Sequence, residues 1–215
     1  MVRFVVMAAG LATRMGQDKL ALPWKATTVL GHVLQTLIEA ITLQELRSLR
    51  ESSLSVDTEI VVVARHPMEI YLTKDLIQSF NSCSGTWLEV SCPKPLAETI
   101  RDGLQDLESR VQCIAFLPGD QVGVTAKELA DCLGKVLKDP PDFLVPIAGD
   151  KAVSPVFFHK RYVPELLGLE GEQGGREILY RYPERWCRYP VDEQFFLDVD
   201  TPEQYEALLI IHKGD

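Results

Sequence analysis

The chain has 215 residues, of which 46% are hydrophobic, and a formal net charge of −9. This length suits one α/β domain with an adequate core, and no apolar stretch approaches the ~20 residues that a membrane-spanning helix needs. The acidic balance argues against a nucleic-acid-binding surface, which is usually basic. It leaves room for an anionic small substrate, because salt screens remote charges over about 8 Å.

The N-terminus and the cysteines favour a cytoplasmic protein. Arg3 interrupts the first apolar run, which therefore does not read as a signal peptide. The five cysteines are scattered and lack C-x-x-C spacing, which argues against a zinc site and a disulfide framework; they are Cys83, Cys92, Cys113, Cys132 and Cys187.

The first 25 residues carry the strongest local pattern. An apolar run from Val2 predicts a short buried strand, which Ala8, Ala9 and Gly10 bring to an end. The segment 10–19 combines glycines with Arg14 and Lys19. Backbone N–H groups of such a loop can hold phosphate oxygens while the cations supply charge. A plain surface turn is the alternative, since the spacing is neither that of a P-loop nor G-x-G-x-x-G.

The following segments alternate between strand and helix. The pattern predicts a helix over 27–49 capped by Thr27 or Thr28, a strand over 59–64, a helix from His66-Pro67 to about residue 80, and a strand over 87–90. A helix over 99–107 and strands over 111–117, 142–146 and 153–158 follow. This repetition predicts a doubly wound, mostly parallel sheet in a single α/β domain. Pro140-Pro141 is the best candidate for a boundary between a nucleotide-binding part, 1–140, and an acceptor-binding part, 141–215.

Two acidic sites lie far apart in this sequence. Asp120 directly follows the strand over 111–117, where a carboxylate faces the ligand crevice and suits Mg²⁺. A plain turn is the alternative. Near the C-terminus, the pattern predicts a strand from Phe196 that presents Asp198 and Asp200 on one side, before a helix capped by Thr201.

The pattern Ala8-Ala9-Gly10, Arg14-Met15-Gly16 and Lys19 resembles the signature of the molybdenum-cofactor nucleotidyltransferases, the molybdopterin cytidylyl- and guanylyltransferases. The resemblance implies a Rossmann-like nucleotidyltransferase fold and Mg²⁺ as cofactor. It implies Arg14, Lys19 and Asp120 as catalytic residues, and Asp120 with Asp198 as metal ligands, Asp198 being favoured over Asp200. The nucleotide-binding residues that it implies are Ala8, Ala9, Gly10, Leu11, Arg14, Met15, Gly16, Lys19, Pro95 and Gly119.

The acceptor side resembles the family less closely. Gly174, Gly175 and Arg176 are similar to a family pattern in which backbone N–H groups and a bidentate guanidinium can contact an anionic acceptor. A glycine-rich loop with a solvated Arg is the alternative. Ser154 stands where the family usually has a histidine, and Glu98 where it usually has a glycine.

The expected reaction transfers a nucleoside monophosphate from an NTP to a phosphorylated acceptor. Ala8-Ala9-Gly10, Gly119-Asp120-Gln121 and Asp198-Val199-Asp200 resemble the cytidylyl side, which favours CTP over GTP. The resemblance implies a molybdopterin-type acceptor and, as a further partner, a molybdoenzyme or its chaperone. A sugar- or polyol-phosphate nucleotidyltransferase and a non-catalytic cofactor-binding accessory protein are the alternatives.

Overall fold

The computed structural model describes residues 1–10, 17–50, 55–193 and 197–212. Its main sheet has the strand order β10-β7-β9-β6-β1-β4-β5, with β8 paired to β7. Strand β9 runs antiparallel to both of its neighbours and β8 antiparallel to β7, whereas the other pairs are parallel. The bounds are β1 Val2–Ala8, β4 Thr58–Ala64, β5 Gly85–Glu89, β6 Cys113–Pro118, β7 Phe143–Ala148, β8 Lys151–Ala152, β9 Val156–His159 and β10 Trp186–Val191.

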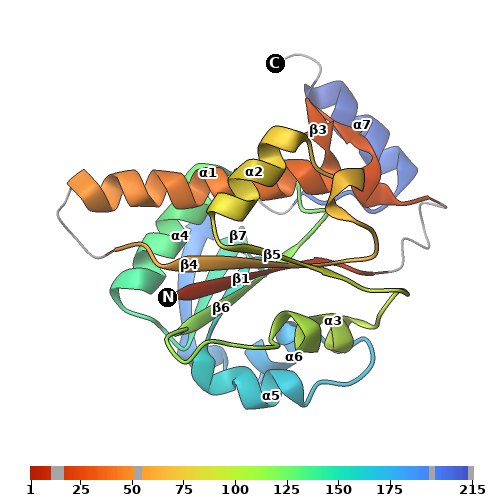
Figure 1. Cartoon of the computed structure of the whole chain (residues 1–215). Helices are drawn as coiled ribbons and strands as arrows, with labels where there is room; N and C mark the ends of the chain where they lie inside the picture. The colour runs from red at the N-terminus through yellow and green to blue at the C-terminus, as the bar shows by residue number, and fades with distance from the viewer. Residues whose placement is uncertain (11–16, 51–54, 194–196, 213–215) are drawn as a thin grey trace.

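The central strands are buried on both faces because almost every one of their side chains is apolar. In β1, Phe4 and Val6 belong to one hydrophobic cluster and Val5 to the other, as the alternation of side chains along a strand requires. The first cluster is covered by α1 (Val29–Arg50), α2 (Lys74–Ser82) and α4 (Ala126–Lys138). The second is covered by α3 (Leu96–Gly103), α5 (Val163–Leu167) and α6 (Gly175–Leu179), and Figure 1 shows these two helical layers on opposite faces of the sheet.

A small hairpin and the last helix form a separate group beside the main sheet. Strands β2 (Pro23–Trp24) and β3 (Thr27–Thr28) pair antiparallel, next to α7 (Pro202–His212), as Figure 1 shows. The Tyr205 hydroxyl donates to the Pro23 carbonyl, and the Tyr205 ring lies 6.4 Å from that of Trp24. Short 3-10 turns complete the fold: η1 (Lys19–Ala21), η2 (Met68–Ile70), η3 (Lys160–Tyr162) and η4 (Pro183–Arg185).

The doubly wound, mostly parallel sheet that the sequence predicts is confirmed. Helix α1 also agrees, and Thr28 rather than Thr27 caps it, because the Thr28 Oγ1 accepts from the Gly31 N–H at 2.9 Å. Both chain parts divided at Pro140-Pro141 contribute strands to one sheet, since β7, β9 and β10 continue the order that begins with β6 and β1.

Several predicted elements are wrong in their bounds. The helix expected from residue 66 is the turn η2 followed by α2, whose cap is Thr73. The helix expected over 99–107 spans Leu96–Gly103 because the chain leaves the extended conformation directly after Pro95. Residues 197–200 form no strand, and α4 and β10 are elements that the pattern did not predict.

Two features of the structure bear on a membrane span and on disulfide bonds. Within the described residues, no helix has the length and apolarity to cross a membrane. All five cysteines are free thiols.

Topology gathers the candidate segments at one edge of the sheet. Gly10 follows β1, Lys94 follows β5 and Asp120 follows β6, so all three lie beyond the carboxyl ends of parallel strands. Ser154 precedes β9, and because β9 is antiparallel its beginning lies at the same edge. Ligands of open α/β sheets bind at this edge.

Candidate active site

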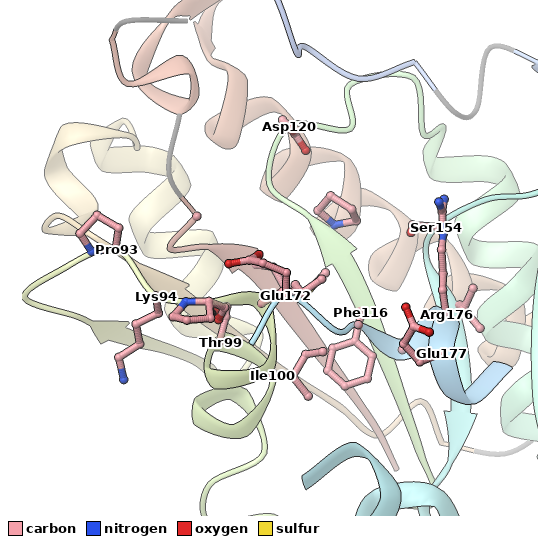
Figure 2. A pocket seen from close by; sticks show the side chains of 18 of the residues that line it. Pro93, Lys94, Thr99, Ile100, Phe116, Asp120, Ser154, Glu172, Arg176 and Glu177 are labelled. Carbon is pink, nitrogen blue, oxygen red and sulfur yellow. Dashed lines mark hydrogen bonds between the residues drawn. The ribbon is translucent and has the colours of Figure 1, made fainter. Parts of the chain in front are cut away.

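A cleft of 1110 Å³ opens along the carboxyl edge of the sheet. Its lining includes charged groups from both ends of the chain together with an apolar wall of Ile100, Phe116 and Phe158. Figure 2 shows Ile100 and Phe116 side by side in this wall. Among the predicted residues, the cleft is lined by Gly10, Lys19, Pro95, Asp120, Ser154, Gly174, Gly175 and Arg176.

The centre of the charged part is the ammonium group of Lys19. It forms ion pairs with the carboxylates of Asp120 and Asp200, the Nζ-to-Oδ1 distance to Asp200 being 2.8 Å. The exposed fractions of the three side chains are 17%, 16% and 36% respectively, so the cluster is largely shielded from bulk water. Two carboxylates that are far apart in sequence thus converge on one cation.

Backbone hydrogen bonds explain how the C-terminal acid reaches this place. The Val199 N–H donates to the Asp120 carbonyl at 3.1 Å, and the Gly123 N–H donates to the Leu197 carbonyl at 3.0 Å. The fully buried Val199 side chain anchors the segment in the core. Asp200 is therefore held beside the loop that carries Asp120.

The carboxylates of the cluster shift the pKa values of Lys19 and Asp198. Burial alone would lower the pKa of Lys19, but Asp120 and Asp200 outweigh this effect and raise it. Burial, followed by the charges of Asp200 and Asp120, raises the pKa of Asp198. Lys19 therefore carries its charge at neutral pH, and Asp198 lies within the field of the two acids that line the cleft.

Asp18, which the sequence reading did not single out, fixes the turn that carries Lys19. Its Oδ1 accepts from the Leu20 N–H at 3.1 Å, and its Oδ2 accepts from the buried Tyr71 hydroxyl at 2.7 Å. Arg65 and His66 at the end of β4 approach the same carboxylate at 3.4 and 3.7 Å. The Asp-Lys dipeptide before an apolar run was the available signal, but Tyr71 could be found only from the fold.

The other end of the cleft is formed by Ser154 and by the segment that leads into α6. The Gln121 amide donates to the Ser154 carbonyl at 2.6 Å and so ties this strand entry to the Asp120 loop. A Cβ on Gly174 would lie 2.7 Å from Leu96, and one on Gly175 would lie 2.7 Å from Phe158. A side chain at either position would therefore require Leu96 or Phe158 to shift. Figure 2 shows the Arg176 side chain extending toward Ser154.

The remaining predicted residues lie outside this lining or outside the described residues. Leu11, Arg14, Met15 and Gly16 lie outside the described residues. Ala8, Ala9 and Gly119 are buried and do not line the cleft. A Cβ on Gly119 would lie 3.2 Å from the Met7 carbonyl oxygen.

Asp198 and Glu98 lie outside the lining of the cleft, and Lys94 lines it without joining the charged cluster. Asp198 is not among the described residues that line the cleft, whereas Asp200 is, because residues 197–200 do not form the expected strand. Glu98 is likewise not among them, so its carboxylate does not face this cleft. Lys94 lines the cleft, but its ammonium pairs with Asp102 and extends away from Asp120 in Figure 2.

The donor set of the charged cluster suits a divalent cation. Asp120 and Asp200 present hard carboxylate oxygens to a common point that already attracts positive charge. Within the described ranges, no group of three or more His, Cys, Asp or Glu side chains could hold a metal ion by itself. Mg²⁺ usually takes one or two carboxylates and completes its shell with phosphate oxygens and water, so these residues fit a site shared with a nucleotide.

Comparison with known proteins places the chain in a family and shows a shared fold. A family model described as the MobA-like NTP transferase domain matches residues 4–186. Similar solved structures include Rv0371c from Mycobacterium tuberculosis H37Rv, with a TM-score of 0.69, 23% identity and 97% of each chain covered. Rv0371c in complex with manganese gives a TM-score of 0.63 and 21% identity, covering 97% of this chain and 98% of that chain. The molybdopterin-guanine dinucleotide biosynthesis protein A from Archaeoglobus fulgidus gives a TM-score of 0.60 and 16% identity, covering 99% and 100%. At these identities the solved structures show a shared fold, and no curated protein matches the chain.

Proposed function

The chain belongs to the MobA-like NTP transferase domain family, and we propose that it transfers cytidine monophosphate from CTP, in preference to GTP, to a molybdopterin-type acceptor. Pyrophosphate is the other product. The observation that carries the proposal is the convergence of Lys19, Asp120 and Asp200 in one cleft at the carboxyl edge of the sheet. Such a mixed cluster suits a triphosphate and a divalent ion together.

In the proposed reaction a phosphate oxygen of the acceptor attacks the α-phosphorus of the NTP. The new oxygen–phosphorus bond forms as the bond from the α-phosphorus to the oxygen bridging the β-phosphate breaks, and pyrophosphate leaves. Lys19, together with Arg14, contacts the β- and γ-phosphates and compensates the charge that develops on the leaving group. The acceptor phosphate is already ionised, so the chain needs to supply no general base.

Asp120 and Asp200 are the proposed residues for holding Mg²⁺. When bound, the ion compensates charge on the α-phosphate oxygens. The sequence favours Asp198, but only Asp200 of these two acids lines the cleft among the described residues. Asp198 is therefore proposed to act next to the ion, where its charge adds to the negative field of Asp120 and Asp200.

The acceptor is proposed to occupy the end of the cleft formed by residues from 141–215. Arg176 supplies a planar donor for a phosphate, and Ser154, Gly174 and Gly175 border the same space. The apolar wall of Phe116, Phe158 and Ile100 suits a flat heterocycle. We propose that this synthesis takes place in the cytoplasm and that the product passes to a molybdoenzyme or its chaperone.

The preference for CTP is proposed from three short segments that resemble the cytidylyl side of the family: 8–10, 119–121 and 198–200. Pyrophosphate release is the test, measured with CTP or GTP, with and without molybdopterin, and with a sugar phosphate or polyol phosphate in its place. Release that requires CTP and molybdopterin supports the proposal. Release with the sugar or polyol phosphate alone supports that alternative, and nucleotide binding without release supports an accessory protein.

Substitution of Lys19 tests the site itself. Lys19→Ala should lower turnover about a hundredfold or more, the magnitude typical for loss of one charge-stabilising group. Lys127→Ala is the matched control, because Lys127 is an exposed lysine on α4 whose ion pair is with Asp131. Near-normal turnover of Lys19→Ala would remove Lys19 from the reaction.

A further inference from the structure

The oxygens proposed for the divalent ion are already in contact with a positive charge of the chain itself. Lys19 Nζ pairs with both Asp120 and Asp200, between the β6 loop and the segment before α7. The Lys19 side chain is mostly buried at this contact, since only 17% of it is exposed. The ammonium therefore occupies the place where both carboxylates are jointly available.

The backbone that carries Lys19 is held in position. Asp18 caps η1 through the Leu20 N–H, and Tyr71, itself 1% exposed, holds the other oxygen of Asp18. Lys19 can therefore change partners by rotation of its side chain while its Cα stays in place. Lys19 lines the same cleft as Gly10 and Arg176, so its side chain has open space to rotate into.

We infer that Lys19 is a resident counter-ion that occupies the divalent-cation position of the nucleotide-free cleft, and that a triphosphate draws it away. This rests on the proposed function, which supplies the triphosphate and the ion. An ammonium and a divalent cation repel each other too strongly to share two carboxylates at contact distance. Free metal consequently binds weakly to the chain, and nucleotide and metal bind with positive coupling, because each removes an obstacle to the other.

Replacing the Lys19 cation should therefore improve metal binding even though it impairs nucleotide binding. The experiment measures Mn²⁺ affinity of the full chain at pH 7.5 without nucleotide, by the electron paramagnetic resonance signal of unbound Mn²⁺. Lys19→Met and Lys19→Gln should each bind Mn²⁺ about tenfold or more tightly than the unaltered chain. Lys94→Met, which removes the same charge from the same cleft but breaks the pair with Asp102, should stay within about twofold.

Two results would overturn the inference: unchanged or weaker Mn²⁺ binding in the Lys19 variants, or an equal gain in Lys94→Met. Circular dichroism and thermal unfolding establish that each variant is folded before titration. Two different Lys19 substitutions are used so that the test still stands if one of the variants does not fold. The test is separate from the proposed function, because it involves no turnover. A gain in Mn²⁺ affinity alongside failure of CTP turnover would sink the proposed reaction and leave the counter-ion role intact.

Discussion

The hydrogen bond from Tyr71 to Asp18 gives the sharpest prediction about how the turn that carries Lys19 is stabilised. Burial, followed by the neighbouring Asp18 carboxylate, raises the pKa of Tyr71, so its hydroxyl stays a donor at every working pH. Tyr71→Phe removes only this donor, since the ring remains packed near Trp87 at a centroid distance of 6.0 Å. The Asp18 carboxylate then loses the shortest of these four contacts, at 2.7 Å, and keeps those to Leu20, Arg65 and His66.

The magnitude follows from the charge on the acceptor. Hydrogen bonds to ionised groups contribute about 1.5–3 kcal/mol, and Asp18 keeps the Leu20 N–H, which favours the lower half of this range. A loss of about 2 kcal/mol corresponds to a fall of about 4–8 °C in Tm for a chain of this size. Urea unfolding followed by circular dichroism gives the free energy, and differential scanning calorimetry gives Tm.

A double-mutant cycle isolates the pair. Asp18→Ala combined with Tyr71→Phe should cost about 1–2 kcal/mol less than the sum of the single losses, since each single change already removes the contact. Tyr205→Phe is the control: it removes a hydroxyl that bonds the neutral Pro23 carbonyl near the surface and should cost no more than about 1 kcal/mol. Additivity within about 0.5 kcal/mol would refute the assigned bond.

Three further predictions concern the site, the core and pH. Asp120→Asn should lower turnover about a hundredfold and flatten its dependence on Mg²⁺, because Asp120 pairs with Lys19 at the proposed metal position; an unchanged metal titration would exclude it. Arg3→Met should destabilise the chain by about 3–5 kcal/mol in urea unfolding, since the buried guanidinium pairs with Glu59 and also bonds three carbonyls at the end of α3. Burial, followed by the Arg161 charge, lowers the pKa of His159, so the unfolded chain takes up the proton first and stability falls as pH drops below about 6.5 and through the folded pKa. His159→Asn keeps an acceptor for the Arg161 N–H and should lose less Tm than the unaltered chain between pH 8 and pH 5.5.

Local sequence patterns were enough to predict the fold class and much of the cleft. The β-branched run over 59–64 and the apolar run from Val2 can be stable only when covered on both faces, which gives parallel strands between two helical layers. The end of each such strand then identifies where Gly10 and Asp120 must lie. These inferences depend on periodicity and chain order, which are properties of the sequence itself.

Element boundaries were predicted less well because local competition decides them. Pro95 precedes a helix that begins at Leu96, three residues before the predicted start. Thr73 outcompetes the His66-Pro67 pair as the start of α2, since its hydroxyl caps the Leu76 N–H. The start of α2 thus turns on a single capping hydrogen bond, whereas α3 begins after Pro95 with no side-chain cap.

The sequence by itself determined the doubly wound sheet, the start of the last helix at Thr201, and the presence of an acid after β6, whereas it left Thr27 and Thr28 open as the cap of α1. The tertiary structure decided that Asp200 rather than Asp198 lines the cleft and that Tyr71 supports Asp18. The physical reason is that both outcomes arise from contacts between segments more than 50 residues apart, such as the 181-residue separation of Lys19 and Asp200. No local pattern encodes whether Asp198 or Asp200, which flank the buried Val199, will face the distant Lys19.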